Sequence, residues 1–225
     1  MQTIAASIMC ADQLKLEKEL RDLEKANVEL LHCDVMDGVF VNNLAMGPYV
    51  LEQIKESANI PLDIHLATEN PSNYIDLFAP IHPKYISFHV EASNDVVRDI
   101  NKIKEYGIEP VLALSPQSPI EMIKPYISMV PMILMMTVNP GFAGQKFNYK
   151  VLDKLDELNA LMETMEHRPL IEVDGNINQH TIPLLLERGA NVYVLGTSAL
   201  FNKNEGTYTE KVQQLRELFK SEEFC

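Results

Sequence analysis

The stretch LLHCDVMDG, residues 30–38, is an apolar run that carries two polar side chains at alternate positions. Successive side chains of a β-strand point to opposite faces, so His32 and Asp34 would share one face while Cys33 occupies the other. Two polar groups on one face of an apolar strand need partners, because burying them alone is costly. The stretch therefore predicts a buried strand that ends at a polar site.

Two later apolar runs end in the same way. His65 lies near the end of IPLDIHL, and Asp174 near the end of LIEVDG. A lone histidine at a strand end is more often structural than functional, but a matching carboxylate on a third strand changes the balance. If these runs are neighbouring parallel strands, two imidazoles and two carboxylates meet and could bind a metal ion.

Apolar runs and amphipathic stretches alternate along the whole chain. We count eight strand-then-helix units, and strands buried on both faces are expected to be near-continuous apolar runs. Eight units favour one closed (β/α)8 TIM barrel, an α/β fold that fills residues 1–225 as a single domain, over an open doubly wound sheet. The strand-like runs are TIAASIM, ELLHCDV, PLDIHL, KYISFHV, PVLALS, MVPMILMMTV, LIEVDG and VYVLGTS.

In such a barrel the active site lies at the carboxyl ends of the strands, where the polar groups described above fall. Ser7 ends the first strand and His89 the fourth. We expect His89 to have a structural or supporting role. Met9 and Met36 lie at strand ends and could line a cavity, whereas the methionines of MVPMILMMTV are most simply core residues.

Composition excludes several classes of protein. Lys and Arg number 19 and Asp and Glu 32, a formal net charge of −13, so neither a nucleic-acid surface nor binding to an anionic membrane is expected. The sequence predicts neither a spanning helix nor a signal peptide. Three cysteines form an odd set without a scaffold spacing, which favours a reduced, cytoplasmic protein. A phosphorylated small molecule remains possible, because one local pocket can hold it.

Three glycine-containing loops follow the last three strands. TVNPGFAGQKF can cover a ligand or supply N–H groups to an anion, although Pro140 and Gly141 would also suit an ordinary turn. DGN and LGTS occupy the usual phosphate-binding position of a barrel. Gly175 and Gly196 there would let the backbone approach a phosphate closely.

Together these motifs resemble the ribulose-phosphate 3-epimerase family, in family order from about residue 4 to residue 202. The motifs that carry the resemblance are SIMCAD, HCDVMDGVFVNN, IPLDIHL, ISFHVEA, MMTVNPGFAGQKF, IEVDGNIN and VLGTSALF. FAGQ, the Asn and Gln after DGN, and GTSALFN look closer to the D-allulose 6-phosphate 3-epimerase branch. ISFHVEA is closer to the pentulose enzymes.

The resemblance implies a metal-dependent isomerase. His32, Asp34, His65 and Asp174 would hold one divalent ion, and Asp34 and Asp174 would also act as the acid–base pair at carbon 3. The donor set suits zinc first, with iron, cobalt or manganese as alternatives. A homo-oligomer, dimer or hexamer, is implied as well. The residues implied to bind substrate are Ser7, Met9, Met36, His65, Gly141, Phe142, Ala143, Gly144, Asp174, Gly175, Asn176, Gly196 and Thr197.

Four positions depart from the family pattern around the substrate: Val39, Asn42, Ala67 and Asn70. These departures leave the implied metal ligands and catalytic carboxylates unchanged. They bear on which sugar phosphate is the substrate more than on the type of reaction. We expect conversion of D-allulose 6-phosphate to D-fructose 6-phosphate, with D-ribulose 5-phosphate to D-xylulose 5-phosphate as the alternative. A non-catalytic sugar-phosphate-binding barrel is a further alternative. A decarboxylase or aldolase is disfavoured, because such sites generally need a lysine near the reacting carbon and we find none at a strand end.

Overall fold

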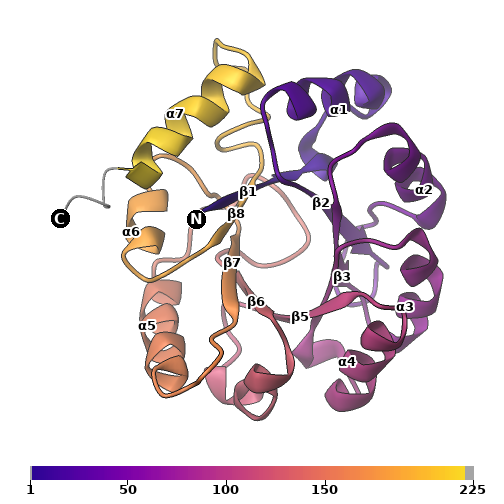
Figure 1. Cartoon of the computed structure of the whole chain (residues 1–225), viewed down its shortest axis with the longest axis vertical. Helices are drawn as coiled ribbons and strands as arrows, with labels where there is room; N and C mark the ends of the chain where they lie inside the picture. Colours follow the sequence, from indigo (N-terminus) through magenta and orange to yellow (C-terminus); the bar gives the residue numbers. More distant parts are fainter. Residues whose placement is uncertain (1, 221–225) are drawn as a thin grey trace.

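The computed structural model describes residues 2–220 and shows a closed barrel of eight parallel strands in sequence order, with helices around the outside (Figure 1). The predicted barrel is therefore confirmed. The strands are β1 Thr3–Ser7, β2 Leu30–Met36, β3 Leu62–Ala67, β4 Tyr85–His89, β5 Glu109–Leu114, β6 Met132–Met136, β7 Leu170–Asp174 and β8 Val192–Leu195. The α-helices are α1 Leu16–Lys25, α2 Pro48–Ser57, α3 Ser72–Phe78, α4 Val96–Glu105, α5 Lys150–Met162, α6 Ile182–Leu186 and α7 Tyr208–Lys220.

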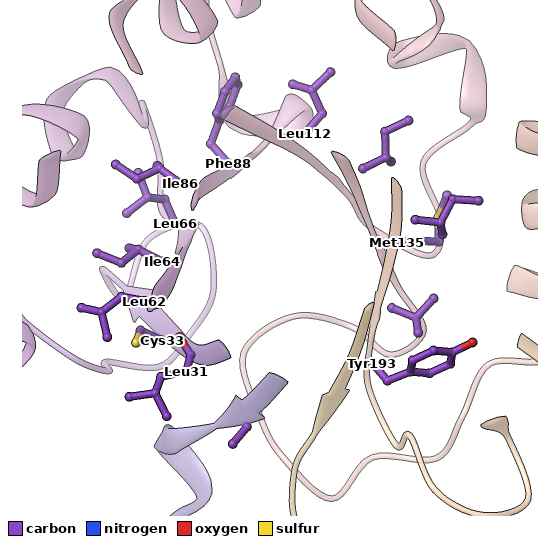
Figure 2. Close-up of a cluster of buried hydrophobic side chains, with 14 of the residues drawn as sticks. Leu31, Cys33, Leu62, Ile64, Leu66, Ile86, Phe88, Leu112, Met135 and Tyr193 are labelled. Atoms are coloured by element: carbon purple, nitrogen blue, oxygen red, sulfur yellow. Dashed lines mark hydrogen bonds between the residues drawn. The ribbon is translucent and has the colours of Figure 1, made fainter. Parts of the chain in front are cut away.

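Alternation along the strands separates two apolar layers. Leu31 and Cys33 of β2 face outward and join a buried cluster beneath the helices, as the sequence predicts for Cys33. Figure 2 shows these side chains, with Ile64 and Leu66 of β3, on the outer side of the strands. The other face of β2 points into the barrel and carries His32 and Asp34.

The barrel interior is filled rather than hollow. An apolar cluster packs inside it, and polar side chains lie toward the carboxyl ends of the strands. The polar groups therefore rest on a packed apolar layer, as in other barrels of this type. The interior cluster comprises Ala5, Leu30, Tyr85, Val111, Ala113, Met132, Leu134, Met136, Val192 and Val194.

One expected helix is absent. Between β5 and β6 the chain forms two short 3-10 segments, Ile120–Met122 and Lys124–Met129, instead of an α-helix. Pro125 lies within this stretch, and proline removes one backbone donor and clashes with the carbonyl four residues earlier. The sequence-based count of eight helices was therefore wrong by one within residues 2–220.

Side-chain caps and glycine mark the helix ends. Asp95 caps α4 by accepting a hydrogen bond from the Arg98 amide at 3.0 Å, and Gly107, with φ +72°, follows the end of that helix. Asp12 accepts from the Leu14 amide, but it caps a 3-10 turn that precedes α1. Within the described residues, no helix combines the length and the apolar character needed to cross a bilayer.

Candidate active site

Four side chains predicted to meet do meet at the carboxyl end of the barrel. His65 Nδ1 lies 3.1 Å from Asp34 Oδ1, and His32 Nε2 lies 3.5 Å from that same oxygen. Asp174 Oδ2 lies 3.8 Å from His32 Nε2. One ligand atom from each of the four residues falls within 4.8 Å of every other. Side chains 142 positions apart in the sequence thus share one small volume.

Strand register explains this convergence. β2 and β3 pair in parallel with Asp34 opposite His65, so both side chains point inward at the same height. Asp174 ends β7 and is paired with Val194 of β8, and only β8 and β1 separate β7 from β2 around the barrel. Ser7 ends β1 opposite His32, and its hydroxyl donates a hydrogen bond to Asp34 Oδ2 at 3.2 Å.

The arrangement fits a divalent metal ion. Ligand atoms about 2.1 Å from a tetrahedral ion lie roughly 3.4 Å apart, and the three distances above lie close to that value. His32 Nε2 is buried, makes no hydrogen bond within residues 2–220, and faces two carboxylates. A buried group in that situation needs a partner, and a shared cation would supply one. The buried His and Asp group could therefore hold a metal.

Neighbouring charges set the pKa values of His32 and Asp34. Burial opposes ionisation of His32, yet the nearby Asp63 and Asp34 carboxylates raise the pKa of His32 well above its usual range. Burial would likewise raise the pKa of Asp34, but the charge of the adjacent His32 and the contact with His65 hold it well below its usual range. Without a metal, His32 and Asp34 therefore form an ion pair.

Asp174 differs from Asp34. Its side chain is 18% exposed, and burial, joined by the negative charges of Asp34 and Asp63 and opposed by His32, raises the pKa of Asp174 to about 7. A carboxyl group with that pKa can hold or release a proton near neutral pH. The pKa values of the two carboxylates of the site are therefore shifted in opposite directions, down for Asp34 and up for Asp174.

A second polar layer, not anticipated from the sequence, lies directly beneath. Asp63 Oδ2 lies 2.6 Å from His32 Nδ1, and Glu172 Oε1 lies 3.7 Å from the same nitrogen. Both carboxylates are fully buried, and burial together with the charge of Asp63 raises the pKa of Glu172 well above its usual range. Each precedes a predicted ligand by two positions, the spacing of one strand face, which could have revealed them.

Three of the four ligands, Asp34, His65 and Asp174, line a cavity of about 290 Å³. His32 is not among its lining residues, whereas every residue that the resemblance assigned to substrate is. Among the described residues, no lysine or arginine contributes to this lining. The predicted lining residues are Ser7, Met9, Met36, His65, Gly141, Phe142, Ala143, Gly144, Asp174, Gly175, Asn176, Gly196 and Thr197. The structure adds Cys10, Asp34, Met136, Val138, Asn139, Pro140, Gln145, Val194 and Ser198.

The segment 139–145 lines the cavity and is held by side chains from other loops. Asn43, from the loop after β2, donates its side-chain amide to the Gly141 carbonyl at 2.7 Å. Asn176, from the loop after β7, donates to the Gln145 carbonyl at 2.9 Å. Gln117, from the loop after β5, donates to the Asn139 side chain, so the segment depends on side chains from three other loops for its position.

Glycine is required where the chain leaves β7. Gly175 has φ +123°, and a Cβ there would lie 2.6 Å from Val138 and 2.8 Å from the Thr137 hydroxyl. Any side chain would force these neighbours apart, so the backbone itself lines the cavity at this point. Asn176 follows in the left-handed region at φ +54°, which asparagine tolerates better than most residues.

Sequence comparison assigns this barrel to a family. The model of the ribulose-phosphate 3 epimerase family matches residues 3–201. The chain belongs to the ribulose-phosphate 3-epimerase family. It is 40% identical over 206 residues to a ribulose-phosphate 3-epimerase of Bacillus subtilis (strain 168), covering 91% of this chain and 94% of that protein. It is 39% identical to one of Helicobacter pylori (strain J99), covering 95% and 98%.

Solved structures agree on the fold alone. A phosphoribosyl anthranilate isomerase from Thermus thermophilus superposes with a TM-score of 0.66 at 11% identity, over 98% of this chain and 99% of that one. A 3-hexulose-6-phosphate synthase gives a TM-score of 0.65 at 13% identity, over 96% and 99%. Identities this low carry the barrel architecture and nothing about the reaction.

Membership of the ribulose-phosphate 3-epimerase family confirms the expected family and the enzyme class, a carbohydrate epimerase. The D-allulose 6-phosphate branch, the metal's identity, the homo-oligomer and the cytoplasmic location stay predictions. None of the four unusual positions is among the residues that line the cavity. Ala67 packs against Met36 and Val41, and Val39 is 72% exposed. Any effect of these positions on the choice of sugar would therefore be indirect.

Proposed function

We propose that this chain is a metal-dependent 3-epimerase that interconverts D-ribulose 5-phosphate and D-xylulose 5-phosphate. One observation carries the proposal: four potential metal ligands, two of them carboxylates, meet at a cavity that glycine-containing loops after β7 and β8 also line. The names of the similar proteins support the pentulose.

Epimerisation at carbon 3 of a 2-ketose removes a proton beside the carbonyl and returns one from the opposite face. Asp34 is kept ionised by His32, so it is in the form that can accept the proton. Asp174, whose pKa is about 7, is suited to hold and deliver one. For the reverse reaction the two exchange roles. When bound, the divalent ion supplies Lewis-acid stabilisation of the negative charge that develops on the substrate oxygens.

The phosphate would bind beside the loops after β7 and β8. Gly175, Asn176, Gly196 and Thr197 line the cavity there, and no cationic side chain contributes to the cavity within residues 2–220. Backbone N–H groups bind phosphate well without a formal positive charge. Binding energy from this remote group would orient carbon 3 between the two carboxylates, as Ser7 fixes Asp34 from the side.

D-allulose 6-phosphate is the second candidate substrate, because FAGQ, the Asn and Gln after DGN, and GTSALFN resemble that branch of the family. Asn176 lines the cavity, and its side chain ties that part of the cavity to the segment 139–145 at Gln145. The hexulose is longer by one hydroxymethylene group, so it would reach a different point along this part of the cavity.

Deuterium exchange at carbon 3 tests the proposal. D-ribulose 5-phosphate and D-allulose 6-phosphate are incubated side by side in D2O with the native protein, the chelated protein, and the chelated protein resupplied with Zn²⁺, Fe²⁺, Co²⁺ or Mn²⁺. We expect faster exchange of the pentulose, loss on chelation, and recovery with metal. Faster exchange of the hexulose would move the substrate to the second candidate. No exchange of either sugar would favour a non-catalytic sugar-phosphate-binding barrel.

A further inference from the structure

His65 is held from behind by a second histidine. Its Nδ1 faces Asp34 and the metal position, whereas its Nε2 points away and lies 3.0 Å from His89 Nε2. The other nitrogen of His89, Nδ1, lies 3.3 Å from Glu91 Oε2. A continuous chain of hydrogen-bonding groups therefore runs from the ligand position to a carboxylate beyond the end of β4.

The direction of this chain follows from the metal site. If His65 Nδ1 offers its lone pair to an ion, its proton must be on Nε2. His89 Nε2 must then accept that proton in a hydrogen bond, which places the proton of His89 on Nδ1. That N–H donates to Glu91, so a single tautomer of each ring satisfies the whole chain.

Glu91 is built to remain an acceptor. The Ser115 amide donates to Glu91 Oε1 at 2.7 Å, and the Ser118 hydroxyl donates to the same oxygen. Burial would raise the pKa of Glu91, but these bonds and the contact with His89 outweigh it and hold that pKa at about 2. The carboxylate is therefore ionised at neutral pH, with one oxygen fixed and the other turned to His89.

The environment of His89 excludes competing partners. The ring is fully buried, and the Phe40 ring packs over it at 4.8 Å between centroids. Besides Glu91, the Ser115 hydroxyl also lies 3.3 Å from Nδ1 and can share its proton. His89 Nε2 thus has His65 as its partner, and His89 Nδ1 faces Glu91 and the Ser115 hydroxyl.

We propose that Glu91, acting through His89, is a positioning residue for the metal: it fixes the tautomer and ring orientation of His65 so that Nδ1 points at the ion. The inference rests on the proposed function, because it requires that His65 is a metal ligand. A purely structural reading, in which His89 and Glu91 only complete the core, predicts a loss of stability without a change in metal binding.

Metal affinity of the metal-free protein separates the two readings. Glu91→Gln, His89→Leu and His89→Gln are titrated with Co²⁺ alone against a competing chelator, and the visible absorption of the Co²⁺ complex is recorded. We expect His89→Leu to weaken Co²⁺ binding about 10- to 100-fold, the range for residues that orient metal ligands, and Glu91→Gln to weaken it about tenfold. His89→Gln should recover part of the affinity, since its amide oxygen can accept from His65.

Asp99→Asn is the matched control, because Asp99 is a fully buried carboxylate that accepts a hydrogen bond from Ser93 outside this chain of groups. It should lower thermal stability and leave Co²⁺ affinity and spectrum unchanged. Wild-type affinity and spectrum in folded Glu91→Gln protein would overturn the positioning role, even if His89→Leu failed to fold. Absence of Co²⁺ binding by the wild-type protein would overturn the metal site of the proposed function as well.

Discussion

The two sides of the barrel mouth are built differently. On the β2–β3 side, His32, Asp34 and His65 project from strands, are almost fully buried, and contact one another directly. On the β7–β8 side, Gly175 and Gly196 contribute backbone from loops, and Asp174 is partly exposed. Groups that must meet within a fraction of an ångström are thus placed on strands, while groups that accommodate a substrate are placed on loops.

The largest expected effect tests the strand side. Asp34→Asn should reduce carbon-3 deuterium exchange by about 10³-fold or more, because the amide can neither accept the proton nor pair with His32 as a charge. Exchange of the ketose phosphate in D2O is the measurement, with metal content determined on the same sample. Substantial exchange by the metal-loaded variant would remove Asp34 from the role of base.

A second prediction compares the two carboxylates beneath the strand side. Asp63→Asn should lower metal affinity about 10- to 100-fold, because Asp63 orients His32 through Nδ1 at 2.6 Å. Glu172→Gln should change it much less, because the raised pKa of Glu172 already keeps that group neutral and glutamine has the same shape. Competition titration with a chelator measures both. Equal losses of metal affinity in the two variants would mean that Asp63 and Glu172 act together through their combined charge, and not through the orientation of His32 by Asp63.

How far the sequence predicts these two sides depends on where the information lies. The strand side follows from period-two spacing, since His32 and Asp34 share a face whatever their neighbours. The partner of each histidine does not follow, because register between β2, β3 and β4 decides that Asp63 meets His32 and that His89 meets His65. Single-strand spacing contains no register.

For the β7–β8 side, the sequence predicts the location of the phosphate-binding loops but not the contacts that hold them. Glycines after the last strands indicate a phosphate position, but the amide ties from Asn43 and Asn176 join segments far apart in the sequence. The missing helix between β5 and β6 has a different cause. Its apolar pattern suits a helix, and Pro125 breaks the backbone hydrogen bonding that the pattern would need.

A third prediction concerns pH and Asp174. In metal-free protein the pKa of Asp174 is about 7 in the folded state, against an ordinary value of 3.8, so between these values the folded state holds a proton that the unfolded state has lost. The contribution of Asp174 to stability is therefore fully present below pH 3.8 and falls as pH rises to about 7. Thermal unfolding at pH 5 and pH 8 should show this fall in the wild type.

Asp174→Asn is the control, because asparagine does not titrate. Its melting temperature should fall less than that of the wild type between pH 5 and pH 8, by an amount on the order of several degrees. An equal fall in both proteins would assign the pH dependence to other groups. Metal binding should also strengthen as pH rises through 7 in the wild type, since the ion displaces the proton of Asp174.

The smallest expected effect tests the loop side. Asn176→Gly keeps the left-handed backbone, which glycine adopts freely, and removes the side-chain bond to Gln145 together with the bond that Asn176 Oδ1 accepts from the Asn178 side chain. One hydrogen bond of about 0.5–1.5 kcal/mol corresponds to about a two- to tenfold rise in KM, with kcat little changed. Asn43→Ala, which removes another hydrogen bond that holds the same segment, is the matched comparison.

If Asn176 also selects sugar length, its replacement alone should change the ratio of kcat/KM for D-ribulose 5-phosphate and D-allulose 6-phosphate. An unchanged ratio with a raised KM would limit Asn176 to holding the segment, and an unchanged KM for both sugars would show that the tie contributes nothing to substrate binding.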